Sequence, residues 1–419
     1  MAVAFTSEPV DDVNVTNQHL IYVMNDTVST PDRYIVEVWE NAYFSLDGTR
    51  IAKVYITPNE NNRGVFDLGD IVNNRLTQTT TVTYQGTNKF VHDLGSVEQA
   101  STTDLCARKY TLKAGTITNG VETFPNVASS LATKYLINGA WQIKDGKHPA
   151  FTDYYCAAAP AKPKAWLTNL VQSSGYVTRY MADEDQGRAQ IIQTALLGVT
   201  SPLNRITYNL YDADGTLLGN SNYTVVLKLD LPQNIHNVPM GPDNVKSFMG
   251  AQWDDDWAYY DIIPNQTGTL VGATMRVYKD CRPIKHEPVQ LAWANNVGGW
   301  DLLRFDARAP KTIQKNEKRF RKDPLDWQAT TTSWNAWDRG TTTFHNEGRI
   351  RFTLTHDQFT ADERALLEYC MRSRLVYYRY GTEDWAPCVV DTNSLVIEPA
   401  GSKMFRVSLA IEDANPVRC

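Results

Sequence analysis

From residue 19 to residue 75, hydrophobic and polar positions alternate in short runs separated by turn-forming residues. In RYIVEVWEN, residues 33–41, the side chains fall into two sets with a period of two, which is typical of a half-buried β-strand. Asp47-Gly48 stands between two apolar runs, and Asp-Gly favours a hairpin turn because glycine tolerates a positive φ. The pattern predicts a meander of antiparallel strands, followed by a short helix from Asp70.

Similar runs predict strands in the rest of the first two thirds of the chain. They are TTTVTYQGTNKFVHDL (79–94), ARKYTLKAGTIT (107–118), RITYNLYDADGTLLGNSNYTVVLKLDL (205–231) and GTLVGATMRVYKD (268–280). Asp-Ala-Asp-Gly at 212–215 resembles the start of a calcium loop, but Tyr223 stands where the bidentate Glu belongs, so we read these residues as a hairpin turn. From Glu122 to Pro163 the pattern loosens, and we expect loops.

A tryptophan lies on each side of a Gly-Gly turn in LAWANNVGGWDLLRF, residues 291–305. Gly298-Gly299 suits the corner of a β-hairpin, with Trp293 on one strand and Trp300 on the other. We expect the two rings to close the end of a sandwich or barrel, with a platform that stacks on glycans as the alternative.

One amphipathic helix is predicted near the C-terminus, in QFTADERALLEYCMRSR (358–374). Thr360 and Glu363 have the spacing of a capping box, in which each side chain bonds the other's backbone amide. One face is apolar and is expected to pack on a sheet: Leu366, Leu367, Cys370 and Met371. Strands are expected before it in RIRFTLT and after it in LVYYRYG, WAPCVVDT and KMFRVSLAIED.

Composition supports a mainly β protein, since the 419 residues are rich in tyrosine and tryptophan, which favour pleated surfaces. A chain of this length exceeds one hydrophobic core. We expect antiparallel β-sandwich or barrel domains plus a C-terminal α+β unit with its helix on an antiparallel sheet. The predicted division is an N-terminal β-rich domain with long loops (1–163), a middle β domain (164–290) and a C-terminal α+β domain (291–419).

The formal net charge of −6 argues against a general phosphate-binding surface, so no direct nucleic-acid binding is expected. One segment, KTIQKNEKRFRK (311–322), is nevertheless strongly basic, and its most clustered cations are Lys318, Arg319, Arg321 and Lys322. We interpret it as a solvated linker or as a patch that pairs with an acidic neighbouring chain; contact with nucleic acid or lipid is the alternative.

The densest acidic cluster is WDDDW, in which Trp253 and Trp257 flank Asp254, Asp255 and Asp256. Successive side chains of an extended segment point to opposite faces, so one metal ion would receive two of these carboxylates at most. We therefore expect an exposed acidic loop that is anchored by the tryptophans and placed at a subunit interface. Acidic and basic patches in one chain also allow head-to-tail charge pairing around a ring.

No pattern points to catalysis, a metal or a cofactor. The seven histidines lack zinc-ligand spacing, and no Gly-x-Ser-x-Gly, P-loop or GxGxxG motif occurs. The six cysteines form no CxxC pair and are expected to be reduced. Two carboxylates of a glycoside hydrolase stay open as an alternative, with Asp301, Asp306 and Glu347 as candidates, but we expect no enzyme.

The N-terminus has neither the positive region nor the apolar segment of a secretory signal, and no window has about 18 apolar residues, as a membrane span would need. We therefore expect no membrane span and folding in a cytoplasm.

Five segments, taken in order, resemble virion structural proteins of tailed double-stranded DNA bacteriophages, particularly tail-associated proteins of phages infecting Bacteroidetes, including crAss-like phages. They are RYIVEVWEN, ITPNENNRGVFDLGDIVNN (56–74), AWLTNLVQ (165–172), LAWANNVGGWDLLRF and the C-terminal region with WAPCVVDTNSLVIEP and FRVSLAIEDAN. The resemblance covers residues 15–415, and residues 120–163 match nothing in it.

This resemblance implies a β-rich structural protein in a tail hub, ring or tip, located in the virion and assembled in the host bacterial cytoplasm. Its expected partners are other tail or connector proteins and further copies of itself in a symmetric ring. The alternative is a carbohydrate- or receptor-binding module at the tail tip. Interface residues are predicted in the acidic loop, the tryptophan hairpin and the basic run: Trp253, Asp254, Asp255, Asp256, Trp257, Trp293, Trp300, Lys318, Arg319, Arg321 and Lys322.

Overall fold

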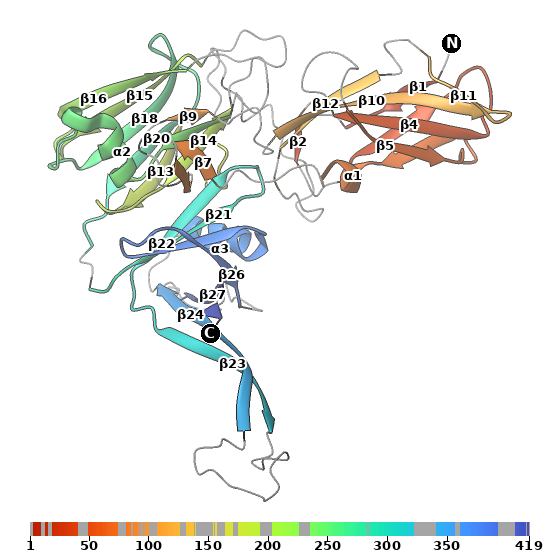
Figure 1. Cartoon of the computed structure of the whole chain (residues 1–419). Coiled ribbons are helices and arrows are strands. Elements are labelled where there is room, and N and C mark those ends of the chain that lie inside the picture. The colour runs from red at the N-terminus through yellow and green to blue at the C-terminus, as the bar shows by residue number, and fades with distance from the viewer. Residues whose placement is uncertain are drawn as a thin grey trace, which may run out of the picture. The chain divides into compact units, whose positions relative to one another are not determined.

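The structure is a computed structural model of the whole chain (Figure 1). It describes residues 3–9, 13–15, 19–40, 49–73, 81–84, 87–90, 92, 95, 97–99, 107–125, 131–137, 139, 154, 156, 164–170, 175–192, 203–225, 235–282, 285–321, 341–356, 361–392, 407–415 and 417–418.

The chain forms two compact units. The first comprises Met1–Arg282, Ala292–Leu302 and Arg372–Arg374, and the second comprises Pro283–Leu291, Leu303–Met371 and Leu375–Cys419. The mainly β fold class is confirmed, because strands of several mostly antiparallel sheets dominate the described chain. The predicted division into three domains stays a prediction.

The N-terminal part of the first unit is a β-sandwich. One sheet has the order β1-β3-β6, formed by Ala4–Ser7, Ile21–Asn25 and Arg63–Asp67. The other has the order β2-β12-β10-β4-β5, formed by Val13–Val15, Leu131–Ile137, Ala107–Thr118, Arg33–Glu40 and Thr49–Ile56, with β11 (Val121–Thr123) on β10. Alternate side chains of both sheets share one core, including Tyr22, Phe66, Val36 and Leu112.

The expectation of loops from Glu122 to Pro163 is wrong in one part. Strand β12 lies between β2 and β10, parallel to the first and antiparallel to the second. Its sequence LATKYLI contains a buried lysine, Lys134, beside three buried apolar residues in succession, which obscures the alternation. Neighbouring strands on both sides stabilise a strand that its local pattern does not indicate.

A second sheet of the first unit has the order β13-β20-β18-β15-β16, formed by Tyr176–Met181, Thr274–Lys279, Tyr259–Gln266, Arg205–Tyr211 and Leu217–Thr224, with β19 (Thr269–Leu270) on β18. The predicted hairpin at 212–215 is confirmed: β15 and β16 pair antiparallel and Gly215 has a φ of 82°. Smaller sheets contain β14 (Arg188–Ile192), β17 (Ile235–Pro239) and β9 (Glu98–Gln99), and β7 (Thr81–Tyr84) with β8 (Thr87–Phe90).

Two short helices belong to the first unit. The predicted helix from Asp70 is confirmed as α1 (Gly69–Asn73). Helix α2 (Pro242–Met249), which precedes the turn η7 (Gly250–Gln252), was not predicted from the sequence. Its signal was present: Pro242 occupies the first turn, where a missing N–H costs nothing, and Gly250 ends the helix at a φ of 55°.

A large sheet has the order β22-β21-β25-β26-β27-β24-β23, and its strands from β25 to β23 belong to the second unit. Its strands are Trp300–Phe305, Val289–Ala294, Val376–Tyr380, Ala386–Val390, Val407–Asp413, Thr341–His356 and Lys311–Arg321, with β28 (Val417–Arg418) on β24. Helix α3 (Ala361–Arg372) buries Leu366, Leu367 and Cys370 as predicted. Thr360 of the predicted capping box lies outside the described residues. No helix in the described chain is long and apolar enough to span a membrane.

Candidate interaction surface

The clearest surface feature of the second unit is a long two-stranded arm, which we define as β23 together with residues 341–351 of β24 (Figure 1). β23 pairs with β24 along its whole length, from Lys311 opposite Phe352 to Arg321 opposite Thr341. On its other side β24 pairs with β27 from Arg351 onward and with β28 at Glu347 and Gly348. Between residues 341 and 346, β24 has only β23 as a described partner.

The side chains of β23 are open to solvent on both faces, whereas most arm residues of β24 are half-buried. Every residue of β23 is exposed except Glu317, which is half-buried. Ile313 is 73% exposed, Phe320 46% and Phe344 63%. The two phenylalanine rings contact each other at 6.1 Å between centroids, so they shield one another only in part. Large apolar side chains held in solvent on a projecting element are typical of surfaces that another molecule covers.

Positive charge dominates the arm. It contains seven basic residues and two acidic ones, a formal charge of +5, whereas the whole chain has −6. The pairing register places Lys315, Arg319 and Arg321 on one face of β23, with Glu317 between the first two. Glu317 forms ion pairs with Lys315 and Arg319. Lys318 and Arg321 have no acidic partner among the described residues.

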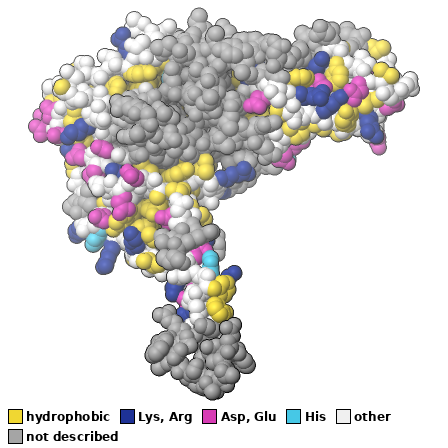
Figure 2. All heavy atoms as spheres, in the orientation of Figure 1, with side chains coloured by type: hydrophobic (Ala, Val, Ile, Leu, Met, Phe, Trp, Pro, Cys, Tyr) yellow, Lys and Arg dark blue, Asp and Glu magenta, His cyan; other side chains and the backbone are white. Residues whose placement is uncertain are grey.

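The other face contains an ion-pair chain. Arg349 contacts Glu347 at 2.9 Å and Glu412 of β27 at 2.6 Å, and His345 lies 3.5 Å from Glu347. These pairs lower the pKa of Glu347, chiefly through its hydrogen bond with Arg349. This series of ion pairs links the base of the arm to the neighbouring strand β27. Figure 2 shows hydrophobic, basic and acidic side chains together on the arm.

The prediction for the basic run is therefore corrected in one respect. Residues 311–321 form an edge strand and not a linker, because β24 offers a full antiparallel register to them. Of the predicted interface residues, Lys318, Arg319 and Arg321 are exposed on this strand, and Lys322 lies outside the described residues.

The acidic loop is confirmed as an exposed turn in the first unit. Asp254, Asp255 and Asp256 are all exposed. Asp255 contacts Lys246 at 2.7 Å and accepts a hydrogen bond from Nε1 of Trp253 at 2.9 Å. The hydrogen bond from Lys246, and to a smaller extent the one from Trp253, lowers the pKa of Asp255. This carboxylate therefore stays negatively charged.

Three of the four tryptophans predicted at an interface are inside the protein. Trp257 and Trp300 are 2% exposed and Trp293 is fully buried. Trp257 anchors the acidic loop by donating to Asp183 at 3.0 Å, and Trp300 packs edge-on against His92 at 5.5 Å. Another molecule cannot reach these three rings. We therefore no longer expect them at a subunit interface or on a platform that stacks on glycans.

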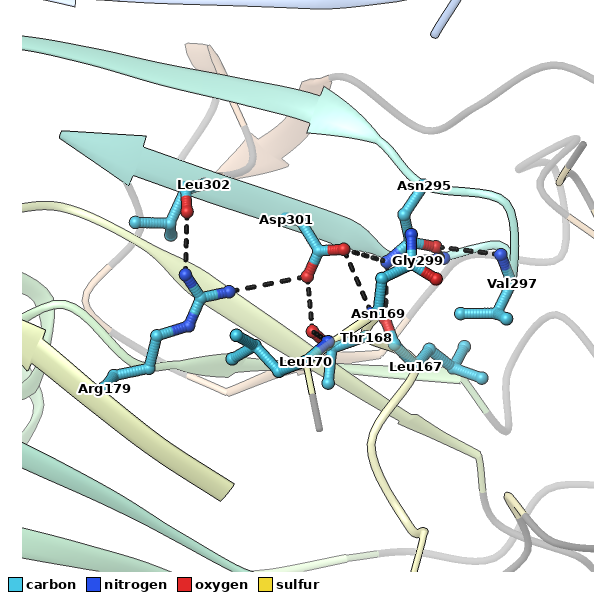
Figure 3. Close-up of polar contacts among 10 residues, drawn as sticks. All are labelled: Leu167, Thr168, Asn169, Leu170, Arg179, Asn295, Val297, Gly299, Asp301 and Leu302. Atoms are coloured by element: carbon cyan, nitrogen blue, oxygen red, sulfur yellow. Dashed lines mark hydrogen bonds and ion pairs between the residues drawn. The ribbon is translucent and has the colours of Figure 1, made fainter. Parts of the chain in front are cut away.

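The Gly-Gly hairpin is fixed by a buried polar network within the first unit (Figure 3). Asp301 is fully buried and accepts hydrogen bonds from Thr168 Oγ1, from the Asn169 amide at 3.1 Å and from Asn295 Nδ2 at 3.1 Å. Arg179 lies 3.4 Å from the same carboxylate and also donates to the Leu302 carbonyl at 2.7 Å.

Asn295 completes this network at the turn. Its side-chain oxygen accepts from the amides of Val297 at 3.1 Å and Gly299 at 2.8 Å, and its Nδ2 also donates to the Leu167 carbonyl at 2.8 Å. Burial raises the pKa of Asp301, while Arg179 and the hydrogen-bond donors oppose that rise. A carboxylate without solvent access cannot meet a substrate, so this cluster is structural and Asp301 is excluded as a glycosidase carboxylate.

A row of tyrosines crosses the sheet β13-β20-β18-β15, and the sequence analysis missed it. The strand register brings Tyr180, Tyr278, Tyr259 and Tyr211 side by side. Ring centroids are 5.4 Å apart for the first pair, 5.6 Å for the middle pair and 4.9 Å for the last. Tyr180, on strand β13 at the end of this row, is 60% exposed. The signal was a tyrosine near one end of each of four strands, but only the register unites them.

Arg276 lies in the next row of the same face. It forms two hydrogen bonds of 2.7 Å with Asp261, and its guanidinium stacks 4.8 Å from the Tyr176 ring and 4.6 Å from the Tyr259 ring. Asp261 neutralises the charge of Arg276. This face of the sheet therefore presents phenol rings and neutral polar groups.

Among the described residues no group of three or more His, Cys, Asp or Glu side chains could hold a metal ion. Cys156, Cys370 and Cys388 are buried free thiols and Cys281 is an exposed one; Cys419 lies outside the described residues.

Comparisons with known proteins add no function. No family model matches the chain, and no curated protein matches it. Among solved structures, a marsupial T cell receptor chain is similar over 84% of this chain and 96% of its own length, at 10% sequence identity and a TM-score of 0.20. A likeness at that level carries no argument.

Proposed function

We propose that this protein is a non-enzymatic structural component of a tailed-phage virion, a tail hub, ring or tip protein that assembles in several copies. The observation that supports the proposal is the arm, in which β23 is exposed on both faces and Ile313, Phe320 and Phe344 remain open to solvent. A two-stranded ribbon is marginally stable in water by itself, and a partner that packs on it supplies what the monomer lacks.

The rest of the protein fits a structural role. The four tyrosines and three buried tryptophans described above support sheets and turns, and Asp301, a fully buried carboxylate with a raised pKa, holds a hairpin. The resemblance to tail-associated proteins, set out from the sequence, points to the same role.

The proposal is tested by locating the chain in particles. Purified virions of a phage that encodes it are examined by mass spectrometry and by electron cryomicroscopy. We expect stoichiometric amounts of the chain and density for its β-sandwich in the tail, repeated about the tail axis. Virions that lack the chain, or density in which it occurs only as a contaminant outside the tail, would contradict the proposal.

Carbohydrate or receptor binding is the second candidate, and the tyrosine row favours it. Rings and hydroxyls of tyrosine are suited to contact neutral polar ligands, and Tyr180 and Tyr176 are 60% and 43% exposed. A glycan array probed with the purified chain tests it. Binding that Tyr180→Ala abolishes, and that the control Tyr55→Ala in the N-terminal sandwich leaves intact, would support this candidate over the structural role.

A further inference from the structure

We propose that the arm docks on the first unit of a second copy of this chain and that the attraction is electrostatic, with the exposed apolar residues closing the contact. This inference rests on the proposed multi-copy structural role and names its partner. The first argument is charge. The arm has a formal charge of +5 and the whole chain −6, so the chain outside the arm has −11.

A second copy offers acidic charge outside its own arm. The first unit contains 30 acidic and 24 basic residues, a formal charge of −6, and the second unit has 17 of each, which leaves −5 outside the arm. The densest acidic cluster of the sequence favours the first unit. The exposed turn at Asp254–Asp256 is one acidic patch of that unit. Because complementary potentials steer association and fix register, an arm of +5 prefers the first unit of a neighbour to the neighbour's own arm.

The second argument comes from the outer edge of β23. Among the described strands it is the last of its sheet, and an edge without a neighbouring strand can pair with another chain. Two β23 strands side by side would bring together ten cations and two acids, since each has five of the former and one of the latter. Like charges therefore block arm-to-arm pairing, and the free edge is left for an acidic partner.

Nucleic acid fits the arm less well. Glu317 is ion-paired with Lys315 and Arg319, and a carboxylate among the cations repels phosphate. Ile313 and Phe344 are the most exposed large apolar side chains on the arm, and a phosphate backbone does not cover them. An acidic protein surface with apolar neighbours meets both requirements.

The first experiment measures self-association of the full chain by sedimentation velocity. The arm variant combines Lys315→Glu, Arg319→Glu and Arg321→Glu, all exposed on one face of β23. The matched control combines Arg63→Glu, Arg205→Glu and Lys285→Glu, which are exposed cations outside the arm. Each triple lowers the formal net charge by six, so a difference between them reports the arm and not total charge.

We expect the wild-type chain to associate, with a dissociation constant that rises with sodium chloride. The arm variant should weaken association at least tenfold, and the control, which adds acidic charge to the first unit at Arg63 and Arg205, should associate at least as tightly as wild type. Circular dichroism checks that both triples are folded. A single Ile313→Ser variant, which removes apolar surface without changing charge, should also weaken association. Wild type that stays monomeric, or an arm variant that associates as the control does, overturns the proposal.

The second experiment identifies the docking surface. Equal amounts of unlabelled and ¹⁵N-labelled chains are mixed and coupled with a carbodiimide, which joins a lysine amine directly to a carboxylate. We expect mixed-isotope peptides that join Lys315 or Lys318 to Asp or Glu residues of the first unit. Cross-links only to the second unit, or only within one isotope, overturn the proposal.

Binding of a labelled DNA duplex tests the alternative, in which the arm contacts nucleic acid. If the arm variant loses duplex binding while its self-association matches the control, the arm is a nucleic-acid contact and the proposal is wrong. The two proposals can fail independently. If the chain is absent from virions but the arm variant still weakens self-association, the proposed tail function is wrong and the docking inference stands.

Discussion

At the scale of single residues, the buried network at the Gly-Gly hairpin is the strongest determinant of local structure. Asp301 satisfies three donors and one guanidinium at once, so its loss leaves several buried groups without partners. Removing one member of a buried ion pair typically costs about 3–5 kcal/mol, because the other charge stays uncompensated. That cost, and not the strength of the pair, is what makes the position sensitive.

We therefore expect Asp301→Asn to lower the free energy of unfolding by about 3 kcal/mol in a urea titration. The substitution keeps the size of the side chain but removes the charge that faces Arg179. Asp256→Asn, at an exposed turn, is the control and should change the value by less than about 0.5 kcal/mol. Equal effects of the two substitutions would show that the network does not stabilise the fold.

The two glycines of the turn resist substitution for different reasons. Gly298 has a φ of 90°, which costs an alanine about 1–2 kcal/mol. At Gly299 a Cβ would lie 1.9 Å from the Leu167 carbonyl oxygen, so the backbone itself would have to move. We expect Gly299→Ala to lower the melting temperature more than Gly298→Ala does, as measured by differential scanning fluorimetry. The reverse order would contradict the close packing of the turn on residue 167.

Two buried histidines predict a pH dependence. Burial lowers the pKa of His92 to about 3 and that of His236 to about 4. The unfolded chain takes up these protons near pH 6.5 and the folded chain does not, so stability is complete above pH 6.5 and falls as pH drops toward 4. Each histidine should account for about 2.6 kcal/mol of loss at pH 4.5 in urea titrations. His236→Gln should reduce this loss, and the exposed control His286→Gln should not.

At the scale of elements, alternation predicts strands well where one face is buried and the other is not. The β15–β16 hairpin has that form, since its burial alternates along β15 and Gly215 marks the turn. The hairpin at Gly298 also follows from its turn residues. Helix α3 was predicted because four apolar residues, Leu366, Leu367, Cys370 and Met371, recur at helical spacing after a capping-box pattern.

The elements that were missed lack these local signals. Strand β12 has buried residues on both faces, including Lys134, and α2 is too short to show a full apolar face. Strand β23 is polar on both faces, so periodicity could not distinguish it from a linker; only the register with β24 defines it. The tyrosine row was missed for the same reason, because residues from four strands meet only after the sheet forms.

At the scale of the whole molecule, composition indicated a mainly β chain larger than one core, and the structure has two compact units. What composition could not supply is the uneven distribution of charge. A net charge of −6 conceals an arm of +5, because sums over the sequence ignore which residues share a surface. The candidate surface therefore follows from the basic run in the sequence, whereas its form as a free edge strand follows only from the fold.

Two units with separate cores should unfold in separable steps. Leu112 of β10 is fully buried in the first unit and Leu409 of β27 is fully buried in the second. A buried leucine truncated to alanine costs about 2–5 kcal/mol, and that cost falls on the unit that contains the cavity. In differential scanning calorimetry we expect two transitions, with Leu112→Ala lowering the midpoint of one and Leu409→Ala that of the other.

The hairpin of β21 and β22 contributes residues to both units, so each substitution should also shift the midpoint of the other unit, by less than it shifts its own. A single transition that both substitutions shift equally would show that the two units unfold as one.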